Sequence, residues 1–204
     1  MVLCFVNMNK DLVRVKGRGG MTPLHLASEI GEVELLAKFL TACPDSIKDV
    51  TVRGETALHI AVKHNNYEAL ELLVCFLRKN YKRGARKLEY TILNQKDEDH
   101  NTILHISSAL SNQQKALQLL VKSGVNLKAK NWKGKTALDM AIEANVEMNR
   151  SILLSAGAKL ATQVTDAPTL ADKLRSTTSQ RNANKLNIKH CCNRRNTNPS
   201  YDRQ

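Results

Sequence analysis

Thr22-Pro23-Leu24-His25 is a phrase that the chain repeats three more times, as Thr56-Ala57-Leu58-His59, Thr102-Ile103-Leu104-His105 and Thr136-Ala137-Leu138-Asp139. The first two threonines are 34 residues apart, as are the last two, and the middle two are 46 apart. A unit of this period therefore occurs four times, with about a dozen residues inserted after the second phrase. The residues two before each threonine are where a tight turn needs positive φ; they are Gly20, Gly54, His100 and Gly134.

Each phrase predicts the start of a helix, because a threonine hydroxyl caps an early helical N–H and Pro23 loses nothing at the first helical position. A second apolar run at helical spacing follows each phrase. These runs are 32–40, 67–74, 115–121 and 150–154. The sequence predicts an all-α fold, a solenoid of four stacked helix–turn–helix units.

The phrases at 22–27, 56–61 and 135–141 closely resemble ankyrin repeats. The runs 42–47, 94–99 and 126–132 look similar to plant ankyrin-repeat proteins that carry a C-terminal hydrophobic membrane domain of the PGG type, a group resembling defence-signalling regulators. The resemblance covers roughly residues 1–158. It implies partner binding on a concave face of turn tips and first helices. The membrane domain of that group has no counterpart in this sequence.

We expect three parts in the chain. Residues 1–17 align with the second helix of a partial N-terminal repeat, which suggests a truncated gene product. Residues 18–160 hold the four repeats, with a basic insertion near 79–92 that extends or interrupts a helix and projects outward. Residues 161–204 are polar and basic, a composition typical of a disordered tail.

The net charge of +12 is concentrated in two segments. Residues 78–90 carry six basic residues against one acidic, and residues 168–204 carry eight against two. These segments favour an alternative function, electrostatic binding of an anionic membrane or nucleic acid surface. Because only 4% of residues are aromatic, stacking on single-stranded nucleic acid is disfavoured. Nucleic acid is not the expected partner, peripheral membrane contact stays open, and no transmembrane span is expected.

Catalytic, metal and cofactor sites are not expected, because no nucleophile, zinc or phosphate-loop motif occurs. His25, His59 and His105 recur at one place in a repeating unit, so we interpret them with Thr22, Thr56, Thr102, Thr136 and Asp139 as structural residues of the repeat. Asp139 in place of histidine is expected to weaken bonding at the end of the stack. The His190-Cys191-Cys192 cluster lacks a second ligand pair for zinc. Five cysteines without a pairing pattern fit a reducing interior, and we expect a cytoplasmic protein, with nuclear or membrane-peripheral alternatives.

The predicted function is a non-enzymatic scaffold or adaptor that binds a protein partner on the concave face in plant defence signalling. A truncated, weakly active paralogue is a further alternative. Trp132, alone in a polar turn, is a candidate anchor or else packs over the adjacent turn. The candidate partner-binding residues are Arg18, Met21, Glu29, Ile30, Arg53, Glu55, Lys63, His64, His100, Asn101, Trp132, Lys133, Lys135 and Glu143.

Overall fold

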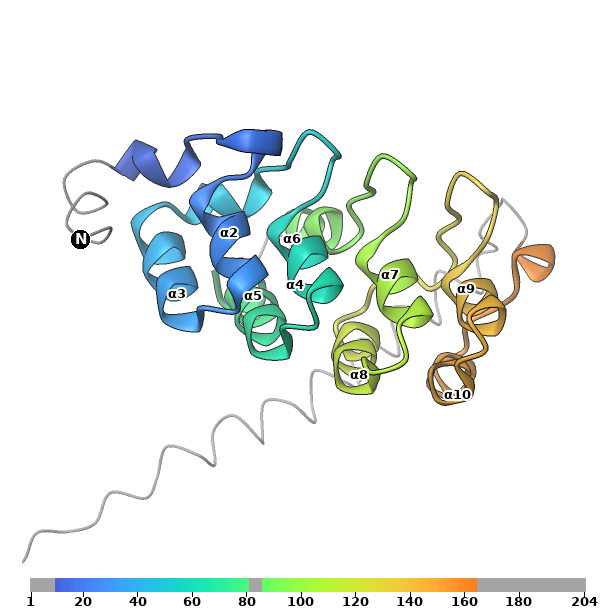
Figure 1. Cartoon of the computed structure of the whole chain (residues 1–204). Helices are drawn as coiled ribbons and strands as arrows, with labels where there is room; N and C mark the ends of the chain where they lie inside the picture. The colour runs from blue at the N-terminus through green and yellow to red at the C-terminus, as the bar shows by residue number, and fades with distance from the viewer. Residues whose placement is uncertain (1–9, 81–85, 165–204) are drawn as a thin grey trace, which may run out of the picture. The chain divides into compact units, whose positions relative to one another are not determined.

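The fold consists of helices in pairs that repeat along the chain (Figure 1). A computed structural model describes residues 10–80 and 86–164, and all regular structure within these ranges is helical. The all-α repeat fold expected from the sequence is confirmed for this part. The tail, predicted to be disordered, lies outside the described residues, as do residues 1–9.

Two rows of helices build the stack. The first helix of each unit packs on the first helix of the next, and the second helices pack likewise. The first row contains α2 (Pro23–Ile30), α4 (Ala57–Lys63), α7 (Ile103–Ala109) and α9 (Ala137–Glu143). The second row contains α3 (Val33–Ala42), α5 (Tyr67–Asn80), α8 (Gln114–Lys122) and α10 (Glu147–Ser155). A turn tip precedes each first helix, and Figure 1 shows the later tips rising on the same side of the stack.

Every first helix begins at its phrase threonine. Thr22, Thr56 and Thr102 each form a capping box with the histidine three residues later, and Thr136 forms one with Asp139. This arrangement satisfies N–H groups that have no partner inside the helix. The positive φ predicted before each threonine is present in all four tips. It is 73° at Gly20, 72° at Gly54, 57° at His100 and 70° at Gly134.

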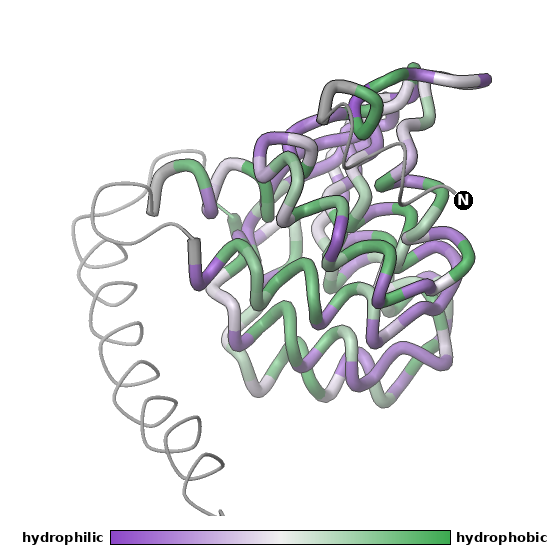
Figure 2. The backbone as a smooth tube through the Cα atoms, turned by 90° about the vertical axis from the view of Figure 1, so that its left-hand side faces the viewer, coloured by the Kyte–Doolittle hydropathy of each residue, from purple (hydrophilic) through white to green (hydrophobic). Residues whose placement is uncertain are grey.

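A continuous core lies between the rows. Leu24, Leu58, Leu104 and Leu138, the third residue of each phrase, are all buried. Leucines of the second row meet them, and small residues three positions after each phrase leucine let neighbouring helices approach closely. Figure 2 shows hydrophobic and hydrophilic segments alternating along the coils, as expected for helices with one buried face. Burial of this face, rather than intrinsic propensity, stabilises helices of only 7 to 14 residues.

The inserted segment both lengthens one helix and adds another. Helix α5 has 14 residues, whereas α3 has 10. A further helix, α6 (Arg86–Leu93), lies between α5 and the third tip. The expectation that this segment only projects outward is wrong for its second half. Ile92 and Leu93 are buried in the core, because the helix presents them on one face beside half-buried Leu88.

Short 3-10 helices connect the units. The 3-10 helices η1 (Lys10–Arg14) and η3 (Pro44–Lys48) are one 34-residue period apart. Val13 in η1 and Ile47 in η3 are both fully buried. The first tip contains η2 (Arg18–Gly20), and η4 (Ala161–Gln163) follows the last repeat. Arg14 pairs with Asp49, with Nε to Oδ2 at 2.9 Å, which ties the first connector to the second.

Candidate functional site

The turn tips share one internal hydrogen-bond pattern. The residue five before the phrase threonine is Thr51, Asp97 or Asn131, and its N–H donates to the carbonyl four residues later at 2.9 to 3.0 Å. Its side-chain oxygen accepts two further backbone N–H groups. For Asp97 Oδ1 these come from Asp99 at 3.0 Å and Asn101 at 2.8 Å. The second, third and fourth tips are therefore each held internally by one polar side chain of their own, whereas the first tip has Gly17 at this position.

A backbone ladder joins consecutive tips. Val52 N–H donates to the Gly19 carbonyl at 3.0 Å, Glu98 to Arg53 at 2.8 Å, and Trp132 to Asp99 at 3.2 Å. The donors are the residues four before each threonine. The ladder fixes the spacing of the tips along one edge and leaves the side chains of these donor residues facing solvent. Val52 is 81% exposed and Trp132 is 65% exposed.

The phrase histidines link first helices to the next tip. His25 Nδ1 accepts from the Thr22 backbone N–H at 3.2 Å and lies 2.8 Å from Thr22 Oγ1. Because Nδ1 is an acceptor, the neutral imidazole carries its proton on Nε2, which donates to the Glu55 carbonyl at 3.1 Å. His105 repeats this with the Lys135 carbonyl, also at 3.1 Å. Burial lowers the pKa of both histidines, so they stay neutral.

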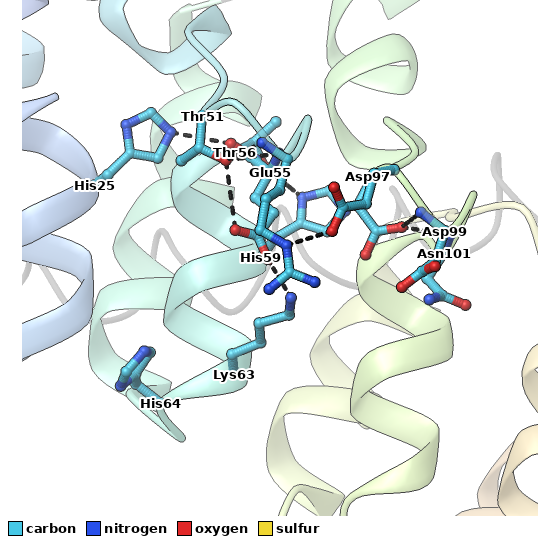
Figure 3. A network of polar contacts seen from close by, with 12 residues as sticks. His25, Thr51, Glu55, Thr56, His59, Lys63, His64, Asp97, Asp99 and Asn101 are labelled. Atoms are coloured by element: carbon cyan, nitrogen blue, oxygen red, sulfur yellow. Dashed lines mark hydrogen bonds and ion pairs between the residues drawn. The ribbon is translucent and has the colours of Figure 1, made fainter. Parts of the chain in front are cut away.

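His59 departs from this pattern (Figure 3). Its Nδ1 lies 2.8 Å from Thr56 Oγ1, but its Nε2 has no hydrogen-bond partner among the described residues. The corresponding acceptor is the Asn101 carbonyl, whose interaction with the ring favours the charged imidazole, although the two groups do not meet hydrogen-bond geometry. Burial is the dominant effect and lowers the pKa of His59 to about 4, against the smaller opposite influence of Asp97.

Charged side chains cross the face around His59 (Figure 3). Buried Glu55 binds Lys63 of α4 and accepts from Thr51 Oγ1 at 3.4 Å. The Arg53 guanidinium binds the Glu98 carboxylate of the next tip. These ion pairs neutralise Glu55 and Glu98, whereas Asp97 and Asp99 beside them form no ion pair within the described residues.

The last unit uses an acid where the others use histidine. Asp139 Oδ2 accepts from the Thr136 N–H at 2.8 Å and from the Ala161 N–H at 3.0 Å. Asp139 therefore also joins α9 to the segment that follows, and the weakening expected at the end of the stack stays a prediction. The next segment offers an N–H instead of a carbonyl, and a carboxylate is the acceptor that suits it.

Side-chain amides tie second-row turns to the preceding first helix. Asn66 Nδ2 donates to the Ser28 and Glu29 carbonyls at 2.9 and 2.7 Å. Gln113 Nε2 donates to the Val62 carbonyl, and Asn149 Nδ2 donates to three carbonyls that end α7. These amides satisfy C-terminal carbonyls that helices leave open.

The tips and first helices form one surface, which we call the first-helix face. The predicted partner-binding residues all lie along it, and their exposure differs. Exposed are Arg18, Ile30, Arg53, Lys63, His64, His100, Trp132, Lys133 and Glu143; half-buried are Met21, Glu29, Asn101 and Lys135. Glu55 was expected to be exposed and is not: it is 6% exposed, because its carboxylate turns inward to Lys63 and Thr51.

The structure brings some of these residues together. His64 Nε2 lies 3.7 Å from Glu29, and Lys135 Nζ lies 2.6 Å from Glu143. Arg18 and Trp132 belong to the first and last tips and do not meet. The sequence prediction omitted Val52 and Glu98. Both lie four residues before a phrase threonine, the position that Arg18 and Trp132 occupy in their tips, so the repeat pattern alone could have identified them. It also missed exposed Leu26 on α2 and exposed Leu110 directly after α7.

Within residues 10–80 and 86–164, no group of three histidine, cysteine or acidic side chains is placed to hold a metal ion. No helix in the same ranges is long and apolar enough to cross a membrane. The His190-Cys191-Cys192 cluster lies outside the described residues.

Comparison with known proteins identifies the repeat. A family model described as ankyrin repeats in three copies matches residues 1–83. The chain is 29% identical over 105 residues to the bovine SMC5-SMC6 complex localization factor protein 1, covering 49% of this chain and 10% of that protein. It is 26% identical over 154 residues to a Caenorhabditis elegans homologue of transient receptor potential cation channel subfamily A member 1, covering 76% of this chain and 12% of that protein. The chain thus spans about a tenth of the length of these relatives.

The family match ends within the segment that separates α5 from α6, yet the same threonine caps, tips and helix pairs continue after it. No enzyme family is among these matches, and ankyrin repeats imply a protein–protein interaction role. Residues 1–83 thus match ankyrin repeats, and the same all-α pairs of helices continue through the rest of the described chain.

Proposed function

We propose that this protein is a non-enzymatic adaptor that binds a protein partner on its first-helix face. One observation carries the proposal. Large apolar side chains are exposed along this face in all four units. The core does not need them, because each first helix packs a different, buried face against it. They are Leu26, Ile30, Val52, Leu110 and Trp132, with exposed fractions from 37% to 81%. Clustered exposed apolar side chains within a polar surface are typical of interfaces.

The setting we propose is plant defence signalling. It is supported by the runs at 42–47 and 94–99, which resemble the plant group with the hydrophobic C-terminal domain. A cytoplasmic location belongs to the same proposal. A truncated paralogue that competes with a longer relative for one partner would use the same face, so the binding test applies to it as well.

Retention of a partner from nuclease-treated extract tests the proposed face. Ile30→Glu and Trp132→Ala change opposite ends of it, and Gln118→Ala, exposed on α8, is the matched control. We expect each face variant to lose partner at least about tenfold, in the range of interface hot spots, at low and high salt alike. The control should retain it.

The alternative, electrostatic binding, predicts a different result. Arg78 and Lys79 are exposed at the end of α5, where Arg78 Nη2 donates to the Lys122 carbonyl at 3.0 Å. If retention disappears at high salt or on Lys79→Gln, and survives both face variants, the partner binds the basic segment and the proposed face is wrong.

A further inference from the structure

A small groove lies on the first-helix face between the third and fourth tips. It encloses about 180 Å³, below the range of drug-sized ligand sites, and is large enough for the end of one side chain. Its walls combine an indole, a thioether, carboxylates and amides. The lining residues are Asp99, Asn101, Asn131, Trp132, Lys133, Met140 and Glu143.

Asn131 fixes the shape of this groove with both ends of its amide. Its Oδ1 accepts the N–H groups of Lys133 and Lys135, each at 3.0 Å, which holds the turn that carries Trp132. Its Nδ2 donates to Asn101 Oδ1 at 3.0 Å and lies 3.8 Å from Met140 Sδ. The turn that carries Trp132 and the groove floor therefore belong to one hydrogen-bonded unit.

The carboxylates around the groove differ in their pairing. Glu143 is bound by Lys135 at 2.6 Å, and Glu98 beside the groove is bound by Arg53. Asp99 is exposed and forms no ion pair within the described residues, since its contacts at 3.0 and 3.2 Å are those of its backbone N–H and carbonyl. In a chain of net charge +12, this tip, with Asp97, Glu98 and Asp99 in succession, is locally acidic.

We propose that this groove receives an arginine side chain of the protein partner, with the guanidinium over the Trp132 indole and hydrogen-bonded to the Asp99 carboxylate. The inference rests on the proposed function and names the chemistry of its partner. A planar guanidinium stacks on an aromatic face and donates two parallel hydrogen bonds to a carboxylate, whereas an ammonium does neither as well. Lys133 lines the same groove as an exposed cation and opposes the incoming charge.

The single tryptophan of the chain makes the groove directly observable. Titration of the full chain with N-acetyl-arginine amide should change Trp132 fluorescence saturably. The matched citrulline amide has the same shape without the charge and should bind about fivefold more weakly or worse, and the lysine amide should lie between them. Equal affinity for arginine and citrulline would overturn the proposal, as would the absence of a saturable change.

Two substitutions test the charges. Asp99→Asn should weaken arginine binding about three- to fivefold, and Lys133→Met should strengthen it about twofold. Glu68→Gln, exposed on the second row, is the control and should leave it unchanged. If the partner is lost on Ile30→Glu while Asp99→Asn changes neither arginine nor partner binding, the proposed face stands and this inference fails.

Discussion

The junction between the second and third units differs from the junctions on either side of it. In the first and third junctions a phrase histidine donates to the next tip, from His25 to Glu55 and from His105 to Lys135. In the second junction His59 Nε2 has no such partner among the described residues. A groove of about 320 Å³ opens there between the N-terminal ends of α5 and α8.

The second junction packs less closely than the first at its tip glycine, yet it keeps the backbone ladder, whose bond from Glu98 N–H to the Arg53 carbonyl is 2.8 Å long. A Cβ atom on Gly20, in the first junction, would lie 2.8 Å from Val52 N, whereas one on Gly54 would lie no closer than 3.4 Å to the next tip. In the second junction the longer side chain of Gln113 bonds the preceding first helix, whereas in the first junction the shorter side chain of Asn66 makes the equivalent bonds. The insertion thus widens one step of the stack without breaking its period, and we infer that the stack separates there first.

Alanine at the two glycines gives the largest contrast. Both have positive φ, which costs any L-residue about 1 to 2 kcal/mol. Gly20→Ala also pushes a Cβ against the Val52 backbone, and overpacking of this kind costs about 1 to 3 kcal/mol more. We expect a loss of about 3 to 4 kcal/mol in the free energy of unfolding for Gly20→Ala, and about half that for Gly54→Ala, measured by urea titration. Equal losses would mean that the tips are equally close.

Acid should weaken the stack through its neutral histidines. The folded pKa of His59 is about 4, below its ordinary value of 6.5, so its contribution to stability is complete above 6.5. As the pH falls below 6.5 the unfolded chain takes up the proton first, and the folded state loses stability until the pH reaches about 4. Over that interval the free energy of unfolding falls by about 3 kcal/mol because of His59. His25 and His105 add further losses, since their pKa values are also lowered.

Unfolding free energies between about pH 7 and 5.5 check this, above the range where most carboxylates titrate. His59→Gln should reduce the slope of unfolding free energy against pH by the amount that corresponds to roughly one proton. A profile of unchanged slope in this variant would contradict a neutral, buried His59.

The fold was predictable where one side chain acts within its own unit. The threonine caps, the positive φ at four positions and the buried phrase leucines follow from local rules, and His100 shows that even a substituted turn keeps its backbone. The sequence did not reveal inward Glu55, since its partners Thr51 and Lys63 lie four residues before it and eight after it, and the local pattern does not show that the tip brings them together. Nor did it reveal buried Ile92 and Leu93, because a run of basic residues before them suggested a loop. Tertiary contacts decide these cases, and the local pattern does not contain them.

Removing the histidines one at a time sharpens the comparison of junctions. His25→Leu and His59→Leu both lose the contact with the phrase threonine, but only His25→Leu also loses a hydrogen bond to the next tip, after which the Glu55 carbonyl keeps the Thr51 N–H as its donor. We therefore expect His25→Leu to be more destabilising by about 1 kcal/mol, the net value of one hydrogen bond. His105→Leu should resemble His25→Leu. If His59→Leu is as costly as the other two, His59 binds the next tip in solution and the second junction is not loose.

The smallest effect is expected at His100, which alone among the four tip positions carries a side chain where φ is positive. His100→Gly removes the strain of that conformation and keeps the backbone hydrogen bond to Asp97, so stability should rise by about 0.5 kcal/mol. Thermal unfolding of His100→Gly and of the control Asn145→Gly tests whether relief of strain is the cause. Asparagine already tolerates its φ of 56°, so Asn145→Gly should gain less stability. The exposed His100 imidazole lies on the first-helix face. If His100→Gly is more stable but no longer binds the partner, a role in binding explains why this tip has a strained histidine where the other three have glycine.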